Sequence, residues 1–338
     1  MDVVGLLPLF ADALLRVARI AALVAGGVFL ANLAVEFGAV ERVARLSRFL
    51  TGPANLPDEA GTAILTTAAS TTAGYGMLAD FRESGRLSDR ATLVAVTINT
   101  FFGFVQHVFT FYAPVLIPIL GLQVGLMYVG ARAGIALAIT LVGVLGGALL
   151  LPSEGASGGS SSTDAEGGTT DAEAAEPGAA EAEATDGGTA TPRDRVRAAA
   201  DSSISTLRRI VPRLAVVYVL VTVLVARVDV ESLSAAAGPL AEVAGLPAAA
   251  IPVVVIFAFD TTAGAATVAP LVGDALSPEQ AVATMLIGGI VSFTVSTFKR
   301  SIPFQFGVWG PEFGTKVVAL NTALKVVFIG TAVAFFLI

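Results

Sequence analysis

The four residues Thr71-Thr72-Ala73-Gly74 occur again as Thr261-Thr262-Ala263-Gly264, and the two copies are the strongest candidates for chemistry in the chain. Each copy lies in a long apolar stretch, where paired threonines and glycines are uncommon. Threonine hydroxyls and carbonyls freed at a helix break can coordinate a cation, and a half-helix N-terminus can hold a polar or anionic group. We therefore expect the hydroxyls and glycines of both copies to bind a solute or an ion: Thr71, Thr72, Gly74, Thr261, Thr262 and Gly264.

Asp260 precedes the second copy, at the position that Ser70 occupies before the first. An acid inside an otherwise uncharged apolar run is costly and indicates function, with a sodium ion or a proton as its partner. The alternative is a structural aspartate that caps the backbone of Thr262 or Ala263. Both interpretations stay open at the level of sequence.

Three more polar side chains, Asn99, Gln106 and His107, lie within one apolar segment, residues 91–120. They are candidates for hydrogen bonds to a polar solute, although bonds between neighbouring helices are the common alternative. Gln106 and His107 are adjacent, so they face about 100° apart on a helix and cannot both point fully into one site. Lys299 and Arg300 follow a later apolar run, where a membrane boundary is the simplest interpretation.

Other chemistries are excluded by composition. The chain has no cysteine and one histidine, so it has no disulfide, thiolate site or multi-histidine metal centre. It also lacks a phosphate-binding loop, a nucleophile elbow and paired catalytic carboxylates. We expect no enzyme activity, no resident cofactor and no nucleic-acid interface.

The composition is that of an integral membrane protein. Of 338 residues, 55% are hydrophobic and only 14% are charged, and the mean hydropathy is +0.80. A soluble domain of this length would not leave charge so sparse over several apolar stretches of about 20 residues. We predict an all-α, multi-pass protein of the cell membrane, with the lipid bilayer as its partner and a homo-oligomer as one arrangement open to it. Scarce lysine and heavy use of Ala, Gly and acids are typical of a salt-loving prokaryote, here interpreted as archaeal.

The elements that must position these residues follow from the apolar pattern. Six segments are long enough to span a bilayer: residues 10–35, 91–120, 123–151, 207–226, 279–298 and 315–338. Residues 36–50 have one apolar side and predict an amphipathic helix in the interface. The two Thr-Thr-Ala-Gly segments, residues 59–80 and 247–272, predict re-entrant helical hairpins, and the alternative is a small-residue helix packed tightly against its neighbours.

An acidic segment divides the chain. Nine acids and no Lys or Arg lie between Pro152 and Pro192, and branched aliphatic and aromatic residues are absent there. Such a composition cannot bury enough surface to fold, so we predict a disordered linker over residues 152–200. A solvated tether is one role for it, and recruitment of a basic partner is another.

The two sides of the linker form an internal repeat, residues 1–151 and 201–338. Thr71 matches Thr261 at an offset of 190 residues, while Phe104 and Pro114 match Phe293 and Pro303 at an offset of 189. The turn after the first copy carries Arg82, Arg86 and Arg90, whereas its counterpart at residues 272–280 has no positive residue. Because positive loops stay in the cytoplasm, the repeats are predicted to be inverted, each with about three transmembrane helices and one re-entrant hairpin. Full spans in place of the hairpins would give four crossings per half and parallel repeats.

Each half, with its Thr/Ser/Gly-rich hairpin, short polar turn and long polar-studded span, resembles the Gate domain family, also called nucleoside recognition domains. The resemblance covers residues 58–120 and 247–303, and rests on Ala-Ser-Thr-Thr-Ala-Gly-Tyr-Gly at 69–76 and Phe-Asp-Thr-Thr-Ala-Gly-Ala at 259–265. The family includes modules of concentrative nucleoside transporters, ferrous iron permeases and spore maturation proteins, and the chain is similar to archaeal stand-alone members. It departs from iron permeases, which carry cysteine in the membrane and a GTP-binding domain, and it lacks the fuller set of spans of nucleoside transporters.

These observations predict a secondary-transporter-like membrane protein. It would recognise a polar solute, such as a nucleoside, and couple its movement to sodium or protons through Asp260. The competing interpretation is a non-transporting membrane scaffold or regulatory subunit, and a divalent cation permease is a weaker third one.

Overall fold

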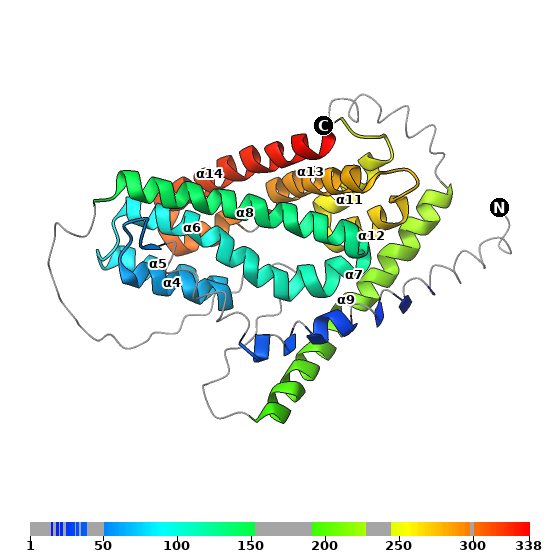
Figure 1. The fold of residues 1–338 in the computed structure, drawn as a ribbon, viewed down its shortest axis with the longest axis horizontal. Helices are drawn as coiled ribbons and strands as arrows, with labels where there is room; N and C mark the ends of the chain where they lie inside the picture. Colours follow the sequence, from blue (N-terminus) through cyan, green and yellow to red (C-terminus); the bar gives the residue numbers. More distant parts are fainter. Residues whose placement is uncertain are drawn as a thin grey trace.

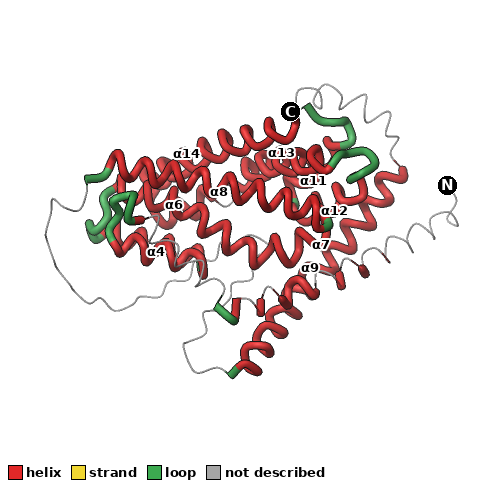
Figure 2. The backbone as a smooth tube through the Cα atoms, viewed as in Figure 1, coloured by secondary structure: helices red, strands yellow, loops and turns green. Residues whose placement is uncertain are grey.

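The fold comes from a computed structural model that describes residues 51–152, 191–227, 245–297 and 301–338, with parts of residues 15–38. Within these residues the chain is helical and forms no strand beyond an isolated bridge between Val272 and Leu276. The loops of the described part gather at the two ends of a bundle of long helices (Figure 2). The expected amphipathic helix at 36–50, most of the linker, and Lys299-Arg300 lie outside the described residues, as does much of the expected span at 10–35.

Three long apolar helices form the body of the protein. One is continuous from Asp89 to Leu120 and consists of α6 (Asp89–His107), the π-helical η2 (Val108–Leu116) and α7 (Ile117–Leu120). The others are α8 (Leu122–Leu150) and α14 (Ile302–Leu337). By length and composition all three can cross a membrane. Large apolar side chains on their outer faces, such as Leu149 (82% exposed) and Phe335 (76%), suit a lipid environment. The described part is therefore that of a membrane protein.

Both Thr-Thr-Ala-Gly segments are pairs of helices joined by one non-helical residue. The first pair is α4 (Asp58–Ala69) and α5 (Thr71–Glu83), and the second is α11 (Ala250–Phe259) and α12 (Thr261–Val268). The joining residues, Ser70 and Asp260, have almost the same extended backbone, with φ −145° and ψ 114° for Ser70 and φ −151° and ψ 114° for Asp260. Each of these two residues ends one helix and caps the next.

Glycine lets the two helices of each pair touch. A Cβ atom on Gly74 would clash with the Thr67 hydroxyl and lie 2.8 Å from the carbonyl oxygen of Ala63. A Cβ atom on Gly264 would lie 2.6 Å from the Cα atom of Phe257. Small residues at such crossings allow backbones to approach closely inside a membrane.

The two hairpins enter the bundle at opposite ends of α8 (Figure 1). Asn55, just before α4, donates from Nδ2 to the carbonyl oxygen of Leu151 at 3.2 Å, at the C-terminal end of α8. Leu246, just before α11, packs in one cluster with Leu120 and Val124, at the N-terminal end of α8. Each hairpin therefore runs from one end of the bundle toward its middle.

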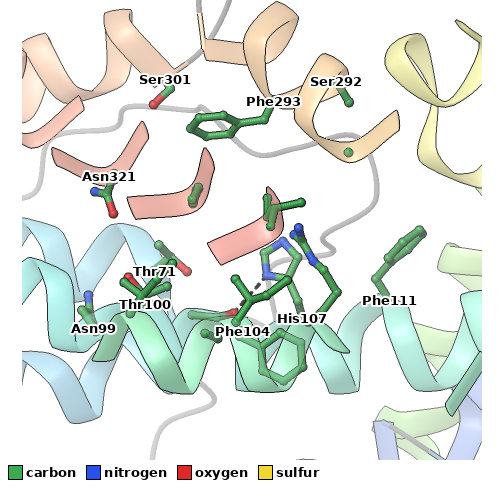
Figure 3. Close-up of a pocket in the computed structure, with 18 of the residues that line it drawn as sticks. Thr71, Asn99, Thr100, Phe104, His107, Phe111, Ser292, Phe293, Ser301 and Asn321 are labelled. Atoms are coloured by element: carbon green, nitrogen blue, oxygen red, sulfur yellow. Dashed lines mark hydrogen bonds between the residues drawn. The ribbon is translucent and has the colours of Figure 1, made fainter. Parts of the chain in front are cut away.

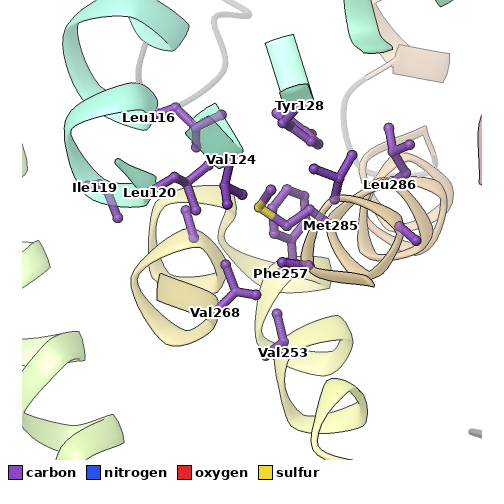
Figure 4. Packing of buried hydrophobic residues seen from close by; sticks show 14 of the residues in the cluster. Leu116, Ile119, Leu120, Val124, Tyr128, Val253, Phe257, Val268, Met285 and Leu286 are labelled. Atoms are coloured by element: carbon purple, nitrogen blue, oxygen red, sulfur yellow. The ribbon is translucent and has the colours of Figure 1, made fainter. Parts of the chain in front are cut away.

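Two hydrophobic clusters follow from this arrangement. One surrounds the first hairpin and includes Ile64, Leu78, Phe102 and Phe313. The other joins α7 and α8 to the second hairpin and α13 (Pro278–Ser296), with Phe257 at its centre (Figure 4). Each hairpin thus has a core of its own.

Local geometry repeats in the two halves. Ser88 accepts the Ala91 N–H before α6, and Ser277 accepts the Gln280 N–H before α13, at an offset of 189 residues. Gly121 before α8 has φ 79° and ψ 164°, while Gly310 inside α14 has φ 72° and ψ 162° at the same offset. Because only glycine adopts this backbone readily, Gly310 divides α14 in two. The last helix therefore begins at Ile302, earlier than the expected start near residue 315.

Helix α9 (Pro192–Arg227) begins inside the region expected to be linker. Asp194 donates its backbone N–H to the Thr191 hydroxyl oxygen, and both the Thr191 N–H and its hydroxyl donate to the Asp194 carboxylate. The Thr191 hydroxyl is also the main cause that lowers the pKa of Asp194. This reciprocal cap, with Pro192 as the first helical residue, starts the helix where composition alone predicted disorder. The expected span at 207–226 lies within α9.

Candidate functional site

A cavity of about 380 Å³ lies between the tips of the two hairpins. Thr67 and Thr71 line it from the first hairpin, and Phe257 and Thr261 line it from the second. The long helices α6, α8, α13 and α14 supply the remaining described walls. In Figure 3 the α13 residues Ser292 and Phe293 lie across the cavity from Thr100 and His107 of α6. The repeated sequence thus meets itself at one place.

The structure sorts the predicted site residues into two groups. Four of them line the cavity: Thr71, Asn99, His107 and Thr261. Gly74 and Gly264 are packing residues within the hairpins. Thr72, Gln106, Asp260 and Thr262 are outside the described lining, although Gln106 and Asp260 hold its edges in place, as shown next.

Gln106 fixes the tip of the first hairpin to α6. The Thr71 hydroxyl donates to Gln106 Oε1 at 2.6 Å, and Gln106 Nε2 donates to the Ala69 carbonyl oxygen at 3.5 Å. The predicted divergence of Gln106 and His107 is confirmed, because Gln106 bonds the hairpin while His107 lines the cavity. Gln106 thus positions Thr71.

Asp260 has the same place in the second hairpin as Ser70 in the first. Its Oδ1 accepts the Ala263 N–H at 2.7 Å, while Ser70 Oγ accepts the Ala73 N–H at 3.3 Å. Its carboxylate lies beside the positive end of the α12 dipole, which stabilises a negative charge there. The capping role weighed from the sequence is confirmed for Ala263, and a role in ion coupling stays a prediction.

A polar pair, Thr67 and Asn99, lies beneath the first tip. Asn99 Nδ2 donates to Thr67 Oγ1 at 2.8 Å, and the Thr67 hydroxyl donates to the Ala63 carbonyl oxygen at 3.2 Å. Asn99 is 2% exposed, and its Oδ1 accepts no hydrogen bond in the described part of the chain. A buried acceptor without a donor costs about 1–3 kcal/mol. Asn99 therefore offers a solute an acceptor that the fold itself leaves unused.

The second half replaces this polar pair with an apolar one. Phe257 stands at the position of Thr67 and Gly288 at that of Asn99, by the two offsets of the repeat. A Cβ atom on Gly288 would lie 2.9 Å from Phe257 Cβ, so the two residues are in contact as Thr67 and Asn99 are. The cavity is consequently polar toward the first hairpin and aromatic toward the second.

His107 Nδ1 lies 3.1 Å from the Gly103 carbonyl oxygen. An Nδ1–H that donates to this carbonyl leaves Nε2 as the acceptor of the neutral ring. Aromatic rings continue from here across the cavity wall, with centroids 5.6 Å apart for Phe104 and Tyr112, 6.2 Å for Tyr112 and Tyr128, and 6.5 Å for Tyr128 and Phe257. This wall can pack against an aromatic or aliphatic part of a solute.

Sequence reasoning missed two cations in the lining, Arg132 and Lys325. Arg132 Nε donates to Tyr112 Oη at 3.3 Å, and Lys325 Nζ lies 4.2 Å from the centre of the Phe293 ring. Arg132 is the one charged residue of the span at 123–151, and such residues mark functional sites by default. That signal was available, but the sequence did not show that α8 and α14 bring the two cations to one cavity.

The comparisons with known proteins name no activity. No protein-family model matches the chain, and no solved structure matches it. It is 22% identical over 318 residues to uncharacterized protein MJ0880 of Methanocaldococcus jannaschii, covering 92% of this chain and 95% of that protein. It is 24% identical over 316 residues to uncharacterized protein MJ0871 of the same organism, covering 90% of this chain and 88% of that protein. The chain thus resembles two archaeal proteins over most of its length.

Proposed function

We propose that this chain is a secondary-transporter-like membrane protein that binds a polar solute in the cavity between its two hairpin tips. The observation that carries the proposal is that Thr71 and Thr261, the first residues of the repeated sequence, line one cavity. Secondary transporters bind their solutes at the interface of two repeats, beside broken helices. The resemblance to the Gate family adds support, and a nucleoside is the first solute to test.

The proposed topology is a pair of inverted repeats with re-entrant hairpins. Support comes from the opposite ends at which the hairpins enter and from the local geometry shared by Ser70 and Asp260. Charge sets the orientation. The end with Arg82, Arg86 and Arg90 is cytoplasmic in this proposal, because positive loops are retained there. Alternating access then consists of rocking one repeat against the other around the fixed cavity.

Coupling to an ion is assigned to Asp260. A proton or a sodium ion on this carboxylate changes the charge at the first turn of α12, next to Thr261 in the cavity wall. Because Asp260 also holds the Ala263 N–H, binding of the ion and the position of the tip are linked. Such a link is what a coupled transporter requires of its ion site.

The leading alternative is a non-transporting membrane scaffold or regulatory subunit. The unused acceptor on Asn99 and the cations in the lining favour transport over this alternative, because a purely structural core gains nothing from them. A divalent cation permease is disfavoured by the same lining, since Arg132 and Lys325 would repel a doubly charged cation.

Uptake into proteoliposomes tests the proposal. Wild-type protein is expected to concentrate a labelled nucleoside or another polar solute under a sodium or proton gradient. The Asp260→Asn variant is expected to equilibrate it without concentrating it. The matched control is Asp274→Asn, a carboxylate exposed in a turn at the end of the bundle, which should leave uptake unchanged. Concentrative uptake by Asp260→Asn would remove Asp260 from the mechanism, and no uptake of any solute by folded protein would favour the scaffold.

A further inference from the structure

We propose that the cavity selects a small organic anion, held by Arg132 and Lys325. This inference rests on the proposed function and names the class of solute for the same site. Arg132 comes from α8 and Lys325 from α14, so one cation is contributed by each half of the chain. Both belong to spans that are otherwise apolar, where a charge is expensive to bury.

The described lining has a positive balance. It holds Arg132, Lys325 and His107, and it contains no Asp or Glu. Asp260 is next in the chain to the lining residue Thr261, and its carboxylate is placed at the N-terminal end of α12, where it caps Ala263. A single carboxylate there does not offset two permanent cations in the cavity wall.

The printed contacts of the two cations are with neutral groups. Tyr112 Oη accepts from Arg132 Nε, and the ring of Phe293 faces Lys325 Nζ. These contacts orient the guanidinium and the ammonium and leave their charge in place. The guanidinium presents several donors in a planar fork, which matches a carboxylate or phosphate group. Lys325 adds a compact ammonium from the other half.

Asn99 defines the far end of the solute. Its Oδ1 lines the cavity and accepts no hydrogen bond in the described residues, so it calls for a donor. The solute that fits has an anionic group at Arg132 and Lys325 and a hydroxyl or amine that donates to Asn99. Between them the ring wall of Phe104, Tyr112 and Tyr128 accommodates an apolar part.

Charge selectivity can be measured without knowing the solute, because the chain has no native cysteine. Ser292, in the wall opposite His107, is changed to cysteine, and the protein is placed in nanodiscs so that both faces are open (Figure 3). The rates of labelling are compared for two reagents of similar size, the anionic sulfonatoethyl and the cationic trimethylammonioethyl methanethiosulfonate. Each rate is divided by the rate with a small neutral thiol in solution. A change in the pKa of the cysteine affects both reagents alike, so the ratio reports the field in the cavity.

We expect the anionic reagent to be favoured by at least about tenfold, the lower bound for focusing of a counter-ion by a cleft of one charge sign. Ser292→Cys combined with Arg132→Gln or with Lys325→Gln should lower the preference, while Arg132→Lys should retain most of it. Thr100→Cys in the opposite wall should give the same order. Thermal unfolding identifies variants that have not folded, and either glutamine variant alone suffices for the comparison.

Two results would overturn the inference, and they differ in what they say about transport. An equal or reversed preference at both cysteines would reject an anion site and still show a cavity open to solutes. Absence of labelling by either reagent at both cysteines would show a cavity closed from both faces, which rejects the proposed function as well. A preference that survives both glutamine substitutions would assign the selectivity to other groups and overturn the roles of Arg132 and Lys325.

Discussion

Ser70 and Asp260 occupy the same turn in the two hairpins, and each accepts the backbone N–H of the alanine three residues later. The distances are 3.3 Å from Ser70 Oγ to Ala73 N and 2.7 Å from Asp260 Oδ1 to Ala263 N. The backbone at the two residues differs by only 6° in φ and not at all in ψ. One half therefore caps its broken helix with a neutral group and the other with a charged one.

Exchange of the two caps separates the structural role of Asp260 from its charge. Asp260→Ser keeps an acceptor for Ala263, so we expect it to cost less than about 1 kcal/mol, the loss being that of a charge at a helix N-terminus. Asp260→Ala removes the acceptor and should cost about 0.5–2 kcal/mol for the cap and the charge effect in addition. Thermal unfolding in detergent measures both. Equal losses in the two variants would show that the cap contributes nothing.

The glycines of the hairpins are predicted to be essential for packing. Gly74→Ala and Gly264→Ala each introduce a methyl group into space already filled by the other helix of the hairpin. Overpacking of this kind costs about 1–3 kcal/mol. The control is Gly76→Ala in the same helix as Gly74, where a Cβ atom meets nothing within 4 Å. That control should be neutral or stabilising by up to about 1 kcal/mol, because alanine favours a helix.

Unfolding temperatures of the three alanine variants, measured side by side, decide the matter. A loss of stability in Gly76→Ala equal to that in Gly74→Ala would assign the effect to helix backbone and not to contact between the two helices.

Much of this fold follows from the sequence because its signals are local. Apolar length predicts the spans that become α6 to α7, α8 and α14, and the repeated Thr-Thr-Ala-Gly locates both hairpins. The start of α9 was missed because it depends on a reciprocal cap between Thr191 and Asp194, which outweighs a disordered composition. The break in α14 was missed because Gly310 is one of many glycines, and nothing local distinguishes it except its match to Gly121.

The site is harder to predict because it depends on which faces of distant helices meet. Thr71 and Asn99 were recognised as polar residues in apolar surroundings, and both line the cavity. Arg132 and Lys325 are separated by nearly two hundred residues, and no local pattern connects them. Gln106 looked like a solute ligand by its type, but its amide is engaged by Thr71 and Ala69, a pairing that only the docked hairpin creates.

The polar pair of the first half is predicted to be exchangeable for the apolar pair of the second. Thr67→Phe alone places a ring against Asn99 and should destabilise the protein by about 1–3 kcal/mol. Asn99→Gly relieves that crowding, as Gly288 does for Phe257. The double variant should therefore be more stable than the sum of the single variants predicts, by about 0.5–3 kcal/mol. The same double variant should lose solute binding, because the acceptor Asn99 Oδ1 is gone.

Thr67→Val provides the control for this pair. It keeps the shape of the side chain but removes the oxygen that accepts from Asn99 Nδ2, so it should destabilise without relief from any glycine at position 99. Additive losses in the Thr67→Phe and Asn99→Gly cycle, measured by thermal unfolding, would show that the halves are not equivalent at this position.

Cysteine labelling in intact cells is expected to place the two polar turns on opposite sides of the membrane. Ser84 ends α5 and is exposed at the arginine-bearing end, while Ala275 is exposed in the turn before α13. Ala275 is a better position than Ser277, whose hydroxyl oxygen caps α13 by accepting the Gln280 N–H. A membrane-impermeant maleimide should label Ala275→Cys from outside and Ser84→Cys only after permeabilisation, with the cysteine-free wild type as the blank. Labelling of both from one side would give parallel halves. The two hairpins would then enter from the same face, and the opposite ends of α8 at which they begin could not be the two faces of the membrane.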